Sequence, residues 1–205
     1  MRFLFVGCLL ILLQTLPVAA QTFENCNKSQ IAYATEALEG AEAIVVRAAA
    51  LVGDTPEYAV WFGRFSKGNA EHVRATLKAI GAALRSDRLK AVCPRIGEED
   101  CTVSTYANVW PDSPYVVNLC PAFFRMPSMI GVVRTSSAFD SGTREGTIIH
   151  EVSHFEVVGG TDDNCYGREV CSEMARTDVS AAIDNADSYQ YYAEDITFTY
   201  PMPSE

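Results

Sequence analysis

The sequence has little positive charge, and its only long apolar run lies at the start. Its 205 residues include 16 Lys and Arg against 26 Asp and Glu, which gives a net charge of -10. Such a surface repels a phosphate backbone, so nucleic-acid binding is excluded. The run from Phe3 to Leu13 is too short to span a bilayer, which takes about 20 apolar residues. We therefore expect no transmembrane helix and no membrane partner.

The apolar run instead predicts a secretory signal over residues 1–20. Arg2 supplies a positive charge before it, and Val18-Ala19-Ala20 places small side chains at a cleavage site. We expect a secreted protein, or a periplasmic one in a bacterium. No repeat or Pro-, Gly- or Ser-rich linker divides residues 21–205, so they predict one globular domain.

No C-x-x-C pair is present, which argues against a cysteine zinc site. The cysteines that follow the signal are Cys26, Cys93, Cys101, Cys120, Cys165 and Cys171. An even number in an exported chain predicts disulfides, and six cysteines allow 15 connectivities. Asn27-Lys28-Ser29 is a glycosylation sequon, usable in a eukaryotic source.

Apolar residues recur at helical spacing through the first half of the chain. They predict a helix over residues 29–52, a short one starting at Pro56, and a third that begins with Asn69 as its cap. Residues 102–109 and 115–119 predict a hairpin, with Cys101 and Cys120 at its two ends. One more strand is expected near residues 130–134, and helix returns in the second half. The fold class is therefore α+β, helix-rich, with a small antiparallel sheet.

Only three histidines occur, and two of them lie in the sequence His150-Glu151-Val152-Ser153-His154. On a helix, H-E-x-x-H sets two imidazoles on one face with a glutamate beside them, which is half of a catalytic zinc site. The third histidine, His72, is expected at the surface of a scaffold helix.

A catalytic zinc ion needs a third protein ligand. The motif H-E-x-x-H-x-x-G-x-x-H is excluded, because Val157 and Gly160 occupy its last two fixed positions. Glu173, nineteen residues after His154, is one candidate. The other is a carboxylate returned to the metal by a turn after Gly159-Gly160, at residues 160–163.

Here the chain resembles the aspzincin metalloendopeptidases, the deuterolysin and peptidyl-Lys metalloendopeptidase group. Their motif continues as G-T-x-D-x-x-Y-G, present here as residues 160–167, and further segments such as Trp61-Phe62-Gly63 and Asn185-Ala186-Asp187 follow in family order. The resemblance covers nearly all of residues 24–195. It implies a zincin-like protease domain whose small sheet lies beside the active-site cleft.

The resemblance also implies roles for single residues. His150, His154 and Asp163 would bind one zinc ion, with Asp162 as a loop carboxylate outside the ligand set. Glu151 would be the general base for a zinc-activated water, and Tyr166 would stabilise the transition state. The alternative for Tyr166 is a packed aromatic side chain.

Residues 185–192 resemble the segment with which the Lys-specific members bind a substrate ammonium group. Asp187 matches their acidic pair, whereas Gln190 replaces the expected Glu, which puts strict Lys specificity in doubt. The alternative for Asp187 is a helix-capping role. Cys26 with Cys93 and Cys101 with Cys120 resemble family disulfides, and Cys165 with Cys171 would close a small loop that this chain adds.

The function expected is a secreted, monomeric zinc endopeptidase that acts on proteins or peptides and prefers basic (Lys/Arg) substrates. The alternative is an exported zinc-containing binding or toxin-like domain with the protease fold but no turnover. Glu151 argues against that alternative, because zinc binding alone has no use for a base at this position.

Overall fold

The computed structural model describes residues 21–201, so the predicted signal over residues 1–20 lies outside the described residues. In chain order, the described elements are β1 (Thr22–Glu24), α1 (Lys28–Leu51), α2 (Pro56–Phe62), α3 (Lys67–Leu84), β2 (Lys90–Val92), β3 (Ala107–Asn108), β4 (Val116–Leu119), η1 (Phe123–Arg125), α4 (Ser137–Asp140), α5 (Arg144–Ser153), α6 (Arg168–Thr177), α7 (Val179–Ile183) and α8 (Ala186–Thr199).

The three predicted N-terminal helices are confirmed, with different starts for the first and third. Asn27 caps α1 through a reciprocal bond pair with Gln30, so the helix begins one residue earlier than expected. For α3 the cap is Ser66, whose side chain accepts a hydrogen bond from the backbone N–H of Asn69. Asn69 is therefore the third residue of the helix and not its cap.

The sheet is mixed, which corrects the expected antiparallel one. Its strand order is β1-β2-β4-β3, and only the β3–β4 pair is antiparallel. That pair confirms the predicted hairpin. Strands β1 and β2 have three residues each, too few for a visible alternation of apolar and polar residues. Parallel strands need a crossover connection, which here runs through three helices, and the disulfide Cys26–Cys93 follows both strands.

The strand expected near residues 130–134 is wrong. This segment forms successive turns, closed by bonds from the Gly131 amide to the Ser128 carbonyl and from the Ser136 amide to the Val133 carbonyl. By contrast, the structure confirms all three expected disulfides: Cys26–Cys93, Cys101–Cys120 and Cys165–Cys171.

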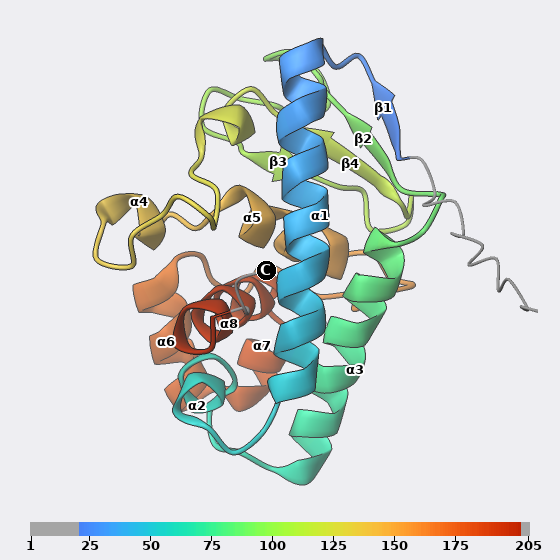
Figure 1. Cartoon of the computed structure of the whole chain (residues 1–205). Helices are drawn as coiled ribbons and strands as arrows, with labels where there is room; N and C mark the ends of the chain where they lie inside the picture. The colour runs from blue at the N-terminus through green and yellow to red at the C-terminus, as the bar shows by residue number, and fades with distance from the viewer. Residues whose placement is uncertain (1–20, 202–205) are drawn as a thin grey trace, which may run out of the picture.

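The sheet lies at one end of the molecule and helices α2, α6, α7 and α8 lie at the other, with α1 running along both parts (Figure 1). Helix α5 lies between the two parts. Tyr58, Phe62, Tyr189 and Tyr192 pack ring against ring between α2 and α8. This aromatic core holds α8 in place, and α5 packs against α8.

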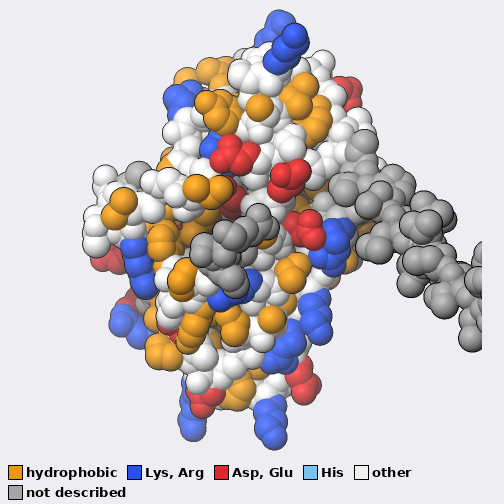
Figure 2. Space-filling model, viewed as in Figure 1, with side chains coloured by type: hydrophobic (Ala, Val, Ile, Leu, Met, Phe, Trp, Pro, Cys, Tyr) orange, Lys and Arg blue, Asp and Glu red, His pale blue; other side chains and the backbone are white. Residues whose placement is uncertain are grey.

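On the face over α1, acidic and basic side chains are interspersed with apolar ones (Figure 2). The negative net charge is therefore not gathered into one patch on that face. Among residues 21–201, no helix has both the length and the apolar character required to cross a bilayer.

Candidate metal centre and active-site cleft

His150 lies in the last turn of α5, a helix whose residues are all buried, and His154 directly follows the helix. Thr143 caps its start by accepting a bond from the Gly146 amide. His154 is the C-cap, and with φ -68° and ψ -26° its backbone is still in the helical conformation. The two imidazole centroids lie 4.8 Å apart, as the four-residue spacing predicts.

The chain then turns back across the end of α5. The Thr161 amide donates to the Ser153 carbonyl at 3.2 Å, and the two hydroxyl oxygens lie 2.6 Å apart. Gly160 has φ +60°, a conformation that side chains other than glycine rarely adopt. This turn brings Asp163 in front of the histidines, as the Gly159-Gly160 break predicts.

Three donor atoms converge at this point. Asp163 Oδ1 lies 3.2 Å from His150 Nε2 and 3.4 Å from His154 Nε2. Zinc bonds of about 2.0–2.1 Å at tetrahedral angles place neighbouring donor atoms roughly 3.3 Å apart. Both distances from Asp163 Oδ1 therefore suit a shared zinc ion, and the ligand atoms of the three side chains all lie within 4.8 Å of one another.

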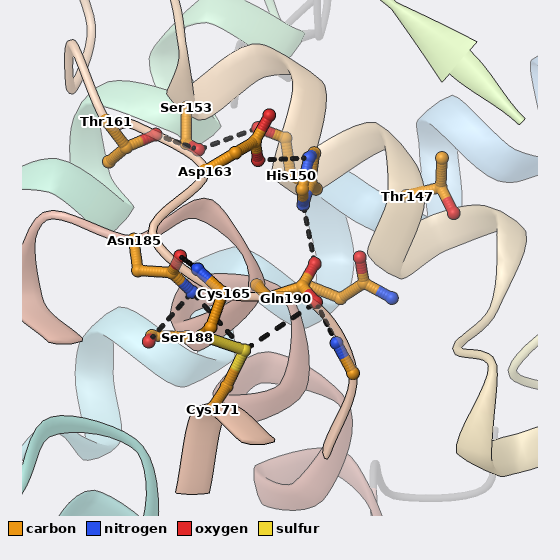
Figure 3. A network of polar contacts seen from close by, with 12 residues as sticks. Thr147, His150, Ser153, Thr161, Asp163, Cys165, Cys171, Asn185, Ser188 and Gln190 are labelled. Atoms are coloured by element: carbon orange, nitrogen blue, oxygen red, sulfur yellow. Dashed lines mark hydrogen bonds and ion pairs between the residues drawn. A yellow bond between two sulfur atoms is a disulfide. The ribbon is translucent and has the colours of Figure 1, made fainter. Parts of the chain in front are cut away.

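The Nδ1 nitrogen of each imidazole ring already makes a hydrogen bond. His150 Nδ1 lies 2.7 Å from Asp187 Oδ1, and His154 Nδ1 lies 2.7 Å from the Thr161 carbonyl oxygen. In Figure 3, dashed lines join His150 to Asp163 on one side and to a side chain of α8 on the other. Because both Nδ1 atoms donate, both Nε2 atoms keep their lone pairs for a metal, which is the usual support for histidine ligands.

The metal-free site has strongly shifted pKa values. Burial alone would lower the pKa of His150, but hydrogen bonds to Asp163 and Asp187 outweigh it and raise the pKa to about 10. Burial also opposes ionisation of Asp163, yet its bonds to the two imidazoles hold its pKa far below the usual range. The site thus takes up positive charge, and a bound cation would displace the proton.

Glu151 is buried beside the donor group and lines the cleft. Burial raises the pKa of Glu151, although positive charge on His150 and His154 opposes the shift. A carboxylate with a raised pKa accepts a proton more readily than an ordinary one, which suits a general base.

Tyr166 is not a packed core aromatic. Its side chain is 63% exposed, and its ring stacks over His150 with the centroids 6.3 Å apart. Partial burial and a hydrogen bond to Asp163 raise the pKa of the phenol, which therefore stays a donor at neutral pH. It lies on the loop closed by the Cys165–Cys171 disulfide.

These groups line a cleft of about 660 Å³. Residues 104–109 form its other wall, and they include β3, the edge strand of the sheet. One side of β3 pairs with β4, so its other side is open for a further strand.

Asp187 and Gln190 both line the cleft and both are buried. Asp187 does not cap its own helix: Oδ1 meets His150, and Oδ2 accepts the Gly167 amide at 2.7 Å. Gln190 Nε2 lies 3.4 Å from Glu194 Oε1. Their substrate-binding role stays a prediction.

The remaining candidates lie away from the donor group. Asp162 has an exposed side chain, and its backbone bridges to Asn185. Glu173 is exposed on α6 and pairs with Arg176. His72 is exposed, as expected.

Sequence reasoning named Asp187 and the segment 185–187 but missed their role in holding the ligands. Asp187 supports His150 across 37 positions, and Asn185 Oδ1 accepts the Cys165 amide, which fixes the loop that carries Asp163 and Tyr166 (Figure 3). No local pattern reports these contacts, because they depend on how α8 packs against α5. The H-E-x-x-H spacing only indicates that some second partner of each ring is needed.

Comparison with known proteins agrees with this geometry. The family model described as lysine-specific metallo-endopeptidase, of the aspzincin group, matches residues 47–194. An extracellular protease of Aeromonas hydrophila is 34% identical over 174 residues, which cover 83% of this chain and 46% of that protein. The chain thus spans about half of that relative.

A peptidyl-Lys metalloendopeptidase of Pleurotus ostreatus is also 34% identical, over 84% of this chain and 96% of its own length. Among solved structures, a zinc peptidase from Grifola frondosa superposes with a TM-score of 0.70 at 26% identity, covering 83% of this chain and 97% of that one. Residues 47–194, which the family model matches, include α5, the turn after it and most of α8. The chain belongs to the aspzincin family of metalloendopeptidases.

Proposed function

We propose that the mature chain is a secreted zinc-dependent endopeptidase that prefers basic protein substrates. The observation that carries this proposal is the convergence of His150 Nε2, His154 Nε2 and Asp163 Oδ1 beside Glu151 in an open cleft. The three disulfides and the extracellular Aeromonas relative support export.

When bound, zinc supplies a Lewis acid that lowers the pKa of water and polarises a carbonyl oxygen. Glu151 takes the proton of the attacking water and later gives it to the leaving amine, a double role that suits its raised pKa. The Tyr166 phenol donates a hydrogen bond to the carbonyl oxygen as negative charge develops there. Asp187 and Thr161 keep both imidazoles oriented throughout.

The open side of β3 supports cleavage within a chain rather than at its end. An extended peptide placed along residues 104–109 would continue the sheet through backbone hydrogen bonds. This wall faces the α5 groups across the cleft, so the peptide would pass the donor group with residues on both sides of it.

The preference for basic substrates depends on Asp187 and Gln190. The Asp187 carboxylate carries charge into the cleft, and Gln190 adds an amide dipole but no second charge. The Pleurotus relative is named for cleavage at Lys. We infer a preference for Lys or Arg that is weaker than that of an enzyme with two carboxylates at these positions.

The test maps cleavage sites in a histone by mass spectrometry, with zinc-loaded wild type and Glu151→Ala. The wild type should cut at sites enriched in Lys or Arg, and Glu151→Ala should keep its zinc and lose activity by several orders of magnitude. An active Ala variant would contradict the proposed base. A zinc-loaded wild type that cuts nothing would favour the binding-domain alternative.

A further inference from the structure

A second hollow adjoins the cleft on the side of η1. Its volume is about 340 Å³, and it shares Ser104, Tyr106 and Ser141 with the main cleft. Thr147 of α5 lines the cleft and contacts Met126, which lines the hollow, with Thr147 Oγ1 lying 3.4 Å from Met126 Sδ. A peptide that occupies the cleft therefore has this hollow within reach of a neighbouring side chain.

Among the described residues that line the hollow, Arg125 is the charged one and none is acidic. Its guanidinium donates to two backbone carbonyls, that of Pro121 at 3.2 Å and that of Val103 at 3.3 Å. Within residues 21–201 no carboxylate pairs with it. The charge is thus held in place but not neutralised.

Two hydrogen bonds leave most of this side chain unused. A guanidinium has five N–H donors, so three remain for a ligand, and the residue is exposed. Ser104, Tyr106 and Ser141, which carry hydroxyl groups, line the same space. A fixed guanidinium with hydroxyl groups beside it matches a carboxylate, which accepts several hydrogen bonds at once.

The main cleft, by contrast, is lined by acidic side chains. Glu151, Asp163 and Asp187 line it, together with Asp140 at its rim. A basic side chain of a substrate therefore has a group of opposite charge at Asp187, and an acidic side chain has one at Arg125.

We propose that the hollow around Arg125 is a second specificity subsite, which binds an Asp or Glu side chain of the peptide substrate. This inference rests on the proposed endopeptidase function. It predicts that good sites combine a basic residue at the bond with an acidic residue a few positions away, on one fixed side.

The test uses a set of quenched fluorescent peptides that share one cleavage site and carry Glu, Gln or Lys at each flanking position in turn. For wild type, one position should favour Glu over Lys in kcat/KM by roughly two- to fivefold, the range of a partly exposed ion pair. Arg125→Glu should reverse the preference at that position alone. Arg64→Glu, at an exposed site just after α2, is the matched control and should leave every ratio unchanged.

The Gln peptides serve as a neutral reference for each variant. If Arg125→Glu cleaves them as wild type does and still favours Glu at the same position, the subsite is wrong and the endopeptidase function stands. If wild type cleaves none of the peptides, the function itself fails. Binding of the Glu and Lys peptides to Glu151→Gln, followed by fluorescence anisotropy, then tests the hollow separately: equal affinities would overturn it.

Discussion

Asp162 and Asp163 are neighbours in sequence but differ in what their side chains contact. Asp163 Oδ1 faces both imidazoles, whereas Asp162 is attached to Asn185 by its backbone and its side chain is exposed. We expect Asp163→Ala to weaken zinc binding by more than roughly 100-fold, the upper range for a supporting residue. Asp162→Ala is the matched control and should bind zinc as wild type does. Competition with a chelator measures both, and the reverse result would reassign the ligand.

Gln190 gives a second prediction. Its amide packs against Gly142 and lies beside Glu194. Gln190→Glu adds a negative charge to the cleft, so kcat/KM for a Lys substrate should rise relative to a neutral one by roughly tenfold. Stability should fall, because the new carboxylate faces Glu194. Peptide kinetics and thermal unfolding measure the two effects, with Gln190→Met as the uncharged control. An unchanged Lys preference would remove position 190 from the specificity site.

At this scale, sequence predicts the ligands better than their supports. The H-E-x-x-H spacing is a property of one helix, and the Asp163 turn follows within nine residues of His154, so both can be predicted locally. The choice between Asp163 and Glu173 could not be made from spacing, because both distances are used by zinc enzymes. The Asp187 contact to His150 needs tertiary packing that no pattern reports.

The contact between α5 and α8 is the element that fixes the site. A Cβ atom at Gly146 would lie 2.1 Å from Glu194 Oε1, so only glycine permits this approach. The same Glu194 oxygen accepts bonds from the Thr143 amide at 2.8 Å and from its hydroxyl at 2.9 Å. Its other oxygen pairs with Arg168. Glu194 thus supports the start of the helix that carries the histidines.

Burial raises the pKa of Glu194 to about 7, although Arg168 and Thr143 favour the charged form. The folded state then binds this proton more tightly than the unfolded chain, where the value is 4.5. The stability from this group is complete below pH 4.5 and is lost as the pH rises through about 7. Glu194→Gln cannot ionise and should lack that slope.

Thermal unfolding of metal-free wild type and Glu194→Gln between pH 4 and pH 8 measures this effect. The stability difference, wild type minus variant, should fall with rising pH by an amount on the order of 1–3 kcal/mol. Taking the difference removes the contribution of the histidines to the pH dependence of stability, because they titrate in both proteins. A difference that grows with pH would show that the Arg168 pair governs and that Glu194 is charged throughout.

Elements were predictable where their signals are local and long. Helices α1 and α3 follow from apolar spacing over many turns, and the β3–β4 hairpin from one turn between two strand-like segments. The parallel pair β1–β2 could not be predicted, since it pairs residues 22–24 with residues 90–92, far apart in the sequence, over only three positions. The mixed sheet follows from that long-range contact.

The whole molecule carries a net charge of -10, yet the face over α1 shows charges of both signs interspersed. The excess of negative charge, which that face does not gather into a patch, produces a long-range field that attracts basic proteins before they reach the cleft. Such attraction extends over about 10 Å at 0.1 M salt and fades as salt rises.

We therefore expect kcat/KM for histone cleavage to fall several-fold as salt is raised from about 10 mM to about 300 mM. A short neutral peptide with the same cleavage site should change little, because it experiences only the cleft and not the field around the molecule. Rates for both substrates at each salt concentration test this, with zinc content checked throughout. An equal fall for the two would place the salt effect in the cleft and the hollow beside it, where the Asp187 and Arg125 charges act, and would leave the outer field without a role.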